Sequence, residues 1–150
     1  MLTFLKKYSF ILFCIIALVL PDRALKGLFN PGVFTEFYVG AVSTLFSLGW
    51  IFLIVYLCVF VMPKKAGKIV FIIISSLFIL LSFSEYIYYK IFGQIFWLKS
   101  IVLAGEGADY LGYVMELIDL RIILHTILSI VSLLIASLKW KHPVLSLKQT

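Results

Sequence analysis

The sequence predicts an all-α integral membrane protein, and three observations support this fold class. Of the 150 residues, 63% are hydrophobic and 13% are charged, and the mean hydropathy is +1.15. Soluble domains are near half apolar and a quarter charged, so a chain of this length could not bury so much apolar surface. The apolar residues also gather into four long runs separated by polar residues. Runs of about 20 apolar residues are typical of membrane-spanning helices.

The first run, residues 4–20, is predicted to be the first span, with Lys6 and Lys7 reaching back to the membrane surface. Pro21 follows directly and is expected to end the helix. A basic start followed by a short apolar core is also typical of a secretory signal peptide. Because PDRALKG follows without a small-residue cleavage site, an uncleaved span is the preferred interpretation and a signal peptide is the alternative.

The other three runs, residues 37–62, 69–89 and 122–138, are each long enough to cross a bilayer. PKKAGK separates the second span from the third and is predicted to be a short connection. Cys14 and Cys58 lie inside apolar runs, which predicts small buried side chains rather than a disulfide or metal ligands. Small residues that allow close helix approach in lipid form two stripes, Gly40, Ser43 and Ser47 in the second span and Ser129, Ser132 and Ala136 in the fourth.

The distribution of charge predicts which side of the membrane each connection faces. If the amino terminus is cytoplasmic, eight of the 13 basic residues fall on the inner side, namely Lys6, Lys7, Lys64, Lys65, Lys68, Lys139, Lys141 and Lys148. All seven acidic residues then fall on the outer side or at the outer end of a span. Basic residues are enriched on the cytoplasmic side, so both termini are expected in the cytoplasm. This topology explains the net charge of +6 without nucleic acid as a partner.

Two short helices are predicted on the outer face, between the third and fourth spans. Residues 94–103 are apolar almost all round and are expected to dip into the interface. In residues 108–120, the apolar residues recur at the spacing of one helix face: Leu111, Val114, Met115 and Ile118. This amphipathic helix, which follows the GEG break, is expected to lie flat on the outer leaflet or across the tops of the spans.

Polar residues that could carry chemistry are few. The sequence has no Gly-rich phosphate loop, HExxH, CxxC or nucleophile elbow, so it predicts no catalytic, cofactor-binding or metal-ligating residue in this chain. Glu85 lies at the outer end of the third span, and Arg121 and His125 lie at the outer end of the fourth. A charge inside a span costs about 3 kcal/mol and usually has a partner. One hypothesis pairs Glu85 with His125 or Arg121, and the alternative has Glu85 reaching the headgroups alone.

Aromatic residues gather where the third span leaves the membrane. Beside Lys90, the candidate interface or lipid-headgroup contacts are Tyr86, Tyr88, Tyr89, Phe92, Phe96 and Trp97. Tyrosine and tryptophan are enriched at both surfaces of a bilayer, which favours an aromatic belt at the outer interface. A groove for a lipid substrate is the alternative interpretation.

The stretch SEYIYYKIFGQIFWLKSIVLAGEGADYLGYVMELIDL, residues 84–120, resembles the lipoteichoic acid synthase family, which are sulfatase-like phosphoglycerol transferases of bacterial membranes. The resemblance lies in a tyrosine-rich end of the third span, a small-residue break and an amphipathic helix before the next span. These parts are Tyr88, Tyr89, Lys90, Phe92 and Gly93, then residues 104–107, then residues 110–120. Many members have Asp where this chain has Gln94.

The resemblance implies an anchoring role rather than a catalytic one. Members have five spans and an extracellular sulfatase-like domain, whose threonine nucleophile and divalent metal, usually manganese, move glycerol phosphate from phosphatidylglycerol to a growing polymer. This chain is expected to be the membrane portion of such an enzyme in the bacterial cell membrane, truncated before the fifth span, without a cofactor of its own and inactive alone. Its expected partners are membrane lipids, including phosphatidylglycerol, and its own extracellular catalytic domain. The alternative is a complete small membrane protein that acts as a transporter subunit or assembly partner.

Overall fold

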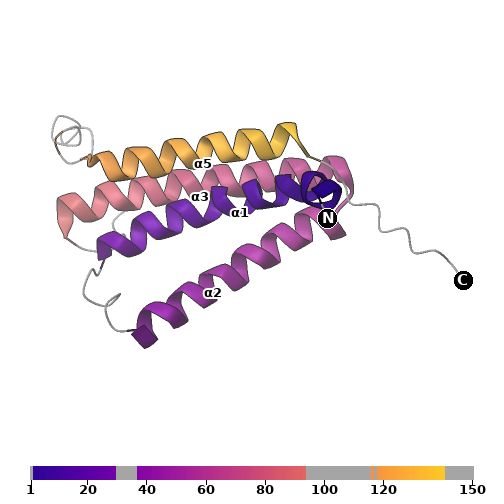
Figure 1. The fold of residues 1–150 in the computed structure, drawn as a ribbon. Coiled ribbons are helices and arrows are strands. Elements are labelled where there is room, and N and C mark those ends of the chain that lie inside the picture. Colours follow the sequence, from indigo (N-terminus) through magenta and orange to yellow (C-terminus); the bar gives the residue numbers. More distant parts are fainter. Residues whose placement is uncertain (1, 30–36, 94–115, 117, 141–150) are drawn as a thin grey trace, which may run out of the picture.

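The computed structural model describes residues 2–29, 37–93, 116 and 118–140, and every regular element within them is a helix. The elements are α1 (Leu2–Phe29), α2 (Phe37–Tyr56), the π-helix η1 (Leu57–Val61), α3 (Lys64–Phe92) and α5 (Leu120–Leu138). The four α-helices alternate in direction along the bundle (Figure 1). The start of α1 and the end of α5 therefore share one end of the bundle, here called the terminal end. At the other end, the connection end, α1 and α3 finish and α2 and α5 begin.

Three helical stretches among the described residues are long and apolar enough to cross a membrane, which indicates a membrane protein. They are Ala41–Val61, formed by α2 and η1, Lys64–Phe92 and Leu120–Leu138. The later turns of α1 carry Asp22, Arg23 and Lys26, and this helix is not in the set. Four spans with cytoplasmic termini therefore stay a prediction. The predicted outer helix 94–103 lies outside the described residues, as does 108–120 apart from its last few positions.

Helix α1 runs further than the sequence predicts. Pro21 was expected to end the first span, but the helix continues through it to Phe29. A proline inside a helix removes a backbone donor and crowds the preceding turn. Here Pro21 is buried, and Ala24, one turn later, packs against Tyr86 of α3 and Ile122 of α5. Packing against two neighbouring helices therefore holds the turns that follow the proline in helical form.

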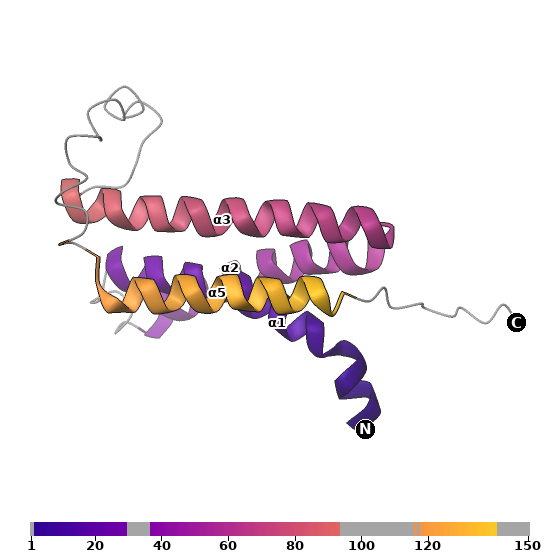
Figure 2. The ribbon, with the colours of Figure 1, turned by 90° about the horizontal axis from the view of Figure 1, so that it is seen from above.

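Helix α1 is also the centre of the bundle, because it packs against α5, α3 and α2. Its most extensive contact is with α5, whose small residues Ser129, Ser132 and Ala136 are all buried. This burial confirms the packing role predicted for that stripe of small residues. Viewed from above, the first turns of α1 diverge from α3 and α5 (Figure 2).

Trp140 anchors the residue pair that follows α5 at the terminal end. Its side chain is 6% exposed, and its ring centroid lies 5.8 Å from that of Phe10 in α1 and 5.5 Å from that of Phe71 in α3. The neighbouring Lys139 places its ammonium 5.5 Å from the centroid of the Phe13 ring. These contacts join α1, α3 and the end of α5 into one aromatic cluster.

The turn between η1 and α3 is tighter than expected. The Met62 N–H donates to the Leu57 carbonyl at 3.0 Å, which closes the π-helical turn, and α3 begins at Lys64, inside the predicted PKKAGK connection. A Cβ on Gly67 would lie 2.0 Å from the Cys58 carbonyl oxygen, so the two backbones approach as closely as only glycine permits. Cys14 and Cys58 are both buried with free thiols.

Candidate functional site

A polar cluster of Asp22, Lys26, Ser43 and Ser47 joins α1 to α2 and is called the α1–α2 polar cluster below. Lys26 Nζ donates to Asp22 Oδ2 at 2.7 Å, one helical turn away on α1. The same ammonium donates across to α2, to the Ser43 carbonyl at 3.0 Å and to Ser47 Oγ. Ser47 Oγ in turn donates to Asp22 Oδ1 at 3.1 Å. The four groups therefore form a closed network between the two helices.

This network is largely withdrawn from the surface of the protein. The Lys26 and Asp22 side chains are 14% and 20% exposed, in a stretch flanked by apolar residues. Charges in such surroundings need both a counter-ion and further hydrogen bonds. Ser47 supplies its hydroxyl and Ser43 its backbone carbonyl, so the network explains a hydroxyl side chain at Ser47.

A cavity of about 170 Å³ adjoins the α1–α2 polar cluster. Asp22 and Ser47 form its polar end, and side chains of α1, α2 and α3 line the rest, among them Leu18, Ile54 and Phe78. Its walls are therefore apolar except where the cluster reaches it. A half-buried carboxylate at the end of an apolar cavity is the arrangement in the described residues with the clearest capacity to bind a ligand.

A second cluster, here called the α3–α5 clamp, joins the end of α3 to the start of α5. The Tyr86 hydroxyl donates to Asp119 Oδ2 at 2.6 Å, and Lys90 Nζ lies 2.9 Å from the same oxygen. The Lys90 ammonium also lies 5.8 Å from the centroid of the Tyr86 ring. The hydrogen bond from Tyr86, followed in size by the one from Lys90, holds the pKa of the Asp119 carboxyl below its usual value.

Asp119 has a second role at the first turn of α5. It is the N-cap residue in an extended conformation, and its carbonyl accepts from the Ile122 N–H at 3.1 Å. Its side chain makes no capping bond to its own helix and bonds to α3 instead. The predicted amphipathic helix 108–120 therefore does not reach residue 120, since residues 118 and 119 are not helical and Leu120 belongs to α5.

The predicted polar residues Arg121 and His125 lie on α5 beside the clamp. The Arg121 guanidinium lies over Gly27 near the end of α1, 3.4 Å from where a Cβ would stand. A cation is favourable there because the last carbonyls of a helix carry partial negative charge. His125 Nδ1 is 2.7 Å from the Arg121 carbonyl of its own helix. Glu85 is half-buried on α3, and its pairing with His125 or Arg121 stays a hypothesis.

The predicted aromatic belt divides in the structure. Tyr86 is only 3% exposed, so its ring contacts protein rather than lipid, which differs from the interface role predicted for it. The helix buries this position because Ala24 and Ile122 pack against it. Tyr88 and Tyr89 are half-buried and Phe92 is exposed, with the Tyr88 and Phe92 ring centroids 4.6 Å apart. Phe96 and Trp97 lie outside the described residues.

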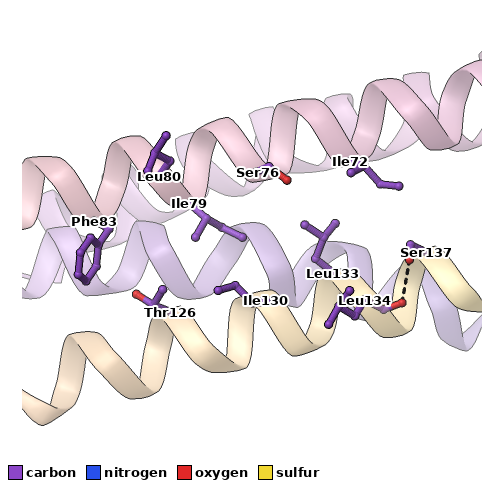
Figure 3. Close-up of a pocket in the computed structure, with 10 residues that line it drawn as sticks. All are labelled: Ile72, Ser76, Ile79, Leu80, Phe83, Thr126, Ile130, Leu133, Leu134 and Ser137. Atoms are coloured by element: carbon purple, nitrogen blue, oxygen red, sulfur yellow. Dashed lines mark hydrogen bonds between the residues drawn. The ribbon is translucent and has the colours of Figure 1, made fainter.

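A larger crevice of about 480 Å³ lies between α3 and α5 (Figure 3). Its walls are mainly apolar, with Ile79 and Phe83 from α3 facing Ile130 and Leu133 from α5. Of its polar side chains, Ser137 bonds to the Leu134 carbonyl of its own helix at 2.9 Å. The crevice therefore offers apolar surface but no charged group, and it differs in this from the smaller cavity beside Asp22.

Sequence reasoning missed the α1–α2 polar cluster because it placed PDRALKG in a connection. Once the helix passes through Pro21, Asp22 and Lys26 stand four residues apart on one face, as do Ser43 and Ser47. The two matching four-residue spacings were the signal that could have revealed the cluster.

Within the described residues, no group of three or more His, Cys, Asp or Glu side chains is arranged to hold a metal ion. Comparison with protein-family models finds no matching family, and comparisons with curated proteins and with solved structures find no matching protein.

Proposed function

We propose that this protein is a membrane anchor whose bundle joins the end of α3 to the start of α5, on either side of residues 93–118, at one membrane surface. The observation that carries the proposal is the α3–α5 clamp. Lys90 lies just before this segment and Asp119 just after it, and their side chains are 2.9 Å apart. The Gly93 N–H also bonds to the Tyr89 carbonyl at 2.8 Å, with Gly93 at φ 67°, so α3 has a defined end where the segment begins.

The finer form of the proposal is an anchoring and orienting domain for a lipoteichoic acid synthase-like phosphoglycerol transferase. Tyr86, Lys90 and Asp119 all lie within residues 84–120, the stretch that carries the resemblance. In this proposal the connection end faces the outside of a bacterial cell membrane and provides the seat for an extracellular catalytic domain. Phosphatidylglycerol would be the lipid that the catalytic domain consumes, and manganese would belong to that domain.

The proposal is tested on the protein purified from its native membranes with an antibody against residues 141–150. We expect a species much larger than 17.1 kDa, or a co-purifying transferase, that releases diacylglycerol from labelled phosphatidylglycerol when Mn²⁺ is added. A species of 17.1 kDa that neither transfers glycerol phosphate nor co-purifies with a transferase would contradict the finer proposal. Anchoring itself is tested separately by cysteine labelling of the two bundle ends in intact cells.

A further inference from the structure

The cavity beside the α1–α2 polar cluster has the form of a lateral binding site, with one polar end and apolar walls. Asp22 and Ser47 form the polar end, and Ile54, Ile74 and Phe78 lie along the walls. Phe46 and Trp50 also line the cavity, and they are 68% and 55% exposed on the outward face of α2. Exposed aromatic side chains on a helix apolar enough to cross a membrane therefore border the cavity, and an amphiphile could enter it there from the bilayer.

The hydrogen bonds of the cluster determine what kind of head group the cavity accepts. An ammonium has three N–H donors, and all three of Lys26 are in use, toward Asp22 Oδ2, the Ser43 carbonyl and Ser47 Oγ. A carboxylate accepts up to about four hydrogen bonds, and Asp22 receives one at each oxygen from Lys26 and Ser47. At the polar end of the cavity, the Ser47 hydroxyl already donates to Asp22, while the Asp22 carboxylate keeps free acceptor positions, so a head group bound there must donate a hydrogen bond.

The charge of the cluster and its depth in the bundle limit further which head groups can bind. The charges of Asp22 and Lys26 cancel, so the cluster provides no net attraction for an ion. Ser47 is six residues after Ala41, where the candidate span in α2 begins, roughly 9 Å along the helix, and Asp22 is hydrogen-bonded to it. At that depth a phosphate or an ammonium loses its hydration at high cost, whereas a hydroxyl loses far less.

We infer that this cavity binds the hydroxyl end of an uncharged amphiphile, such as a long-chain alcohol or an acylglycerol, with the hydroxyl donating to the Asp22 carboxylate. A volume of about 170 Å³ exceeds the roughly 30 Å³ share of one water and is below the roughly 300 Å³ of pockets that enclose drug-sized ligands. The cavity therefore holds the hydroxyl and part of one chain, while the remaining chain lies in the bilayer. This binding does not depend on the anchoring function.

The test uses the full chain in phosphatidylcholine nanodiscs and hexadecanol that carries a photoreactive diazirine in its chain. We expect cross-links to α2 and to the part of α3 around Phe78, mapped by mass spectrometry, and their loss when unlabelled hexadecanol competes. The matched probe is the methyl ether of the same alcohol, which has no donor. Because a hydrogen bond to a charged acceptor is worth about one decade in affinity, the ether should label the site about tenfold less.

Two variants test the location of the site. Ile54→Trp fills the cavity and leaves the α1–α2 polar cluster intact. Labelling by the alcohol should therefore fall at least about fivefold, because the alkyl chain of the probe is excluded from the cavity. Leu80→Trp, in the α3–α5 crevice, is the matched control and should leave this labelling unchanged. Thermal unfolding of both variants shows that they are folded, and the competition experiment on the unmodified chain needs no variant.

Three results would overturn the inference. Equal labelling by the alcohol and its ether would show that the cavity binds an alkyl chain without recognising the hydroxyl group. Stronger labelling by the corresponding hexadecylamine probe would show that the carboxylate recruits cations. Undiminished labelling in a folded Ile54→Trp protein would place the probe elsewhere on the bundle.

Discussion

The ion pair between Asp22 and Lys26 is predicted to stabilise the bundle only as a pair. At 2.7 Å and an effective dielectric constant near 20, the attraction between the two charges is about 6 kcal/mol. Removing each charge from water costs several kcal/mol, so most of that attraction is offset in the intact protein. If one partner is replaced, the attraction is lost while the remaining charge stays desolvated. Each single variant is therefore expected to lower the free energy of unfolding substantially.

The perturbation is therefore a double-mutant cycle with apolar replacements of similar size. Asp22→Leu leaves the Lys26 ammonium with only Ser43 and Ser47 as acceptors, and Lys26→Met leaves the Asp22 carboxylate with the Ser47 hydroxyl as donor. We expect each single variant to lower the free energy of unfolding by about 2–3 kcal/mol, and the double variant by only about 1 kcal/mol. Arg23→Met removes an exposed charge from the same turn and should change it by less than about 0.5 kcal/mol.

Reversible unfolding in bicelles, followed by steric trapping of biotinylated ends, measures these free energies. A double variant whose loss of stability equals the sum of the two single losses would contradict this prediction, because it would show that the two charges do not interact. A cost for Arg23→Met as large as that for Lys26→Met would show that net charge, not pairing, sets the stability.

Three further predictions concern the turn, the terminal end and the clamp. Gly67→Ala places a Cβ 2.0 Å from the Cys58 carbonyl oxygen and should destabilise by about 3 kcal/mol in the same assay, while Gly49→Ala, with nothing within 4 Å, should stabilise by up to about 1 kcal/mol. Trp140→Ala removes the ring between Phe10 and Phe71 and should lower the free energy of unfolding by about 3 kcal/mol. Trp140→Phe keeps an aromatic ring there and should lose less than half as much, as measured by thermal unfolding. The pKa of Asp119 is lowered in the folded protein, so the clamp contributes its full stability above the unfolded-state value near 4 and loses it as the pH falls through the folded-state value. The protection of amides in the first turn of α5 against hydrogen exchange, taken relative to the intrinsic exchange rate at each pH, should therefore stay constant above about pH 4 and decrease below it. Asp119→Asn should show no such acid-dependent step, and an unchanged step in Asp119→Asn would assign it to another group.

The sequence predicted the apolar helices well because long apolar runs leave little choice of structure. The runs 37–62, 69–89 and 122–138 became α2 with η1, α3 and α5, with ends that moved by a few residues where packing extended the helix. The buried stripe of Ser129, Ser132 and Ala136 was also predictable, since small residues at helical spacing are the usual means of close approach in lipid.

Two features were not predictable from local rules, and both involve α1. Local propensity ends a helix at proline, but contacts of Ala24 with α3 and α5 outweigh that preference, and such contacts are invisible before the helices are assembled. The α1–α2 polar cluster depends on this extension, because Lys26 reaches Ser47 only from a helix. For the same reason Tyr86 was predicted to contact the membrane interface or lipid headgroups, although the extended α1 covers it.

The most direct test of the account is the sidedness of the two bundle ends in intact cells. In a chain with Cys14→Ala and Cys58→Ala, single cysteines are placed at Glu116, next to the clamp, and at Lys64, at the start of α3; both positions are exposed. An impermeant maleimide should label Glu116→Cys in intact cells and label Lys64→Cys only after the membrane is permeabilised. Labelling of Lys64→Cys from outside, or of both positions equally, would show that α3 does not cross the membrane in the proposed direction, and the outward-facing anchor would be wrong.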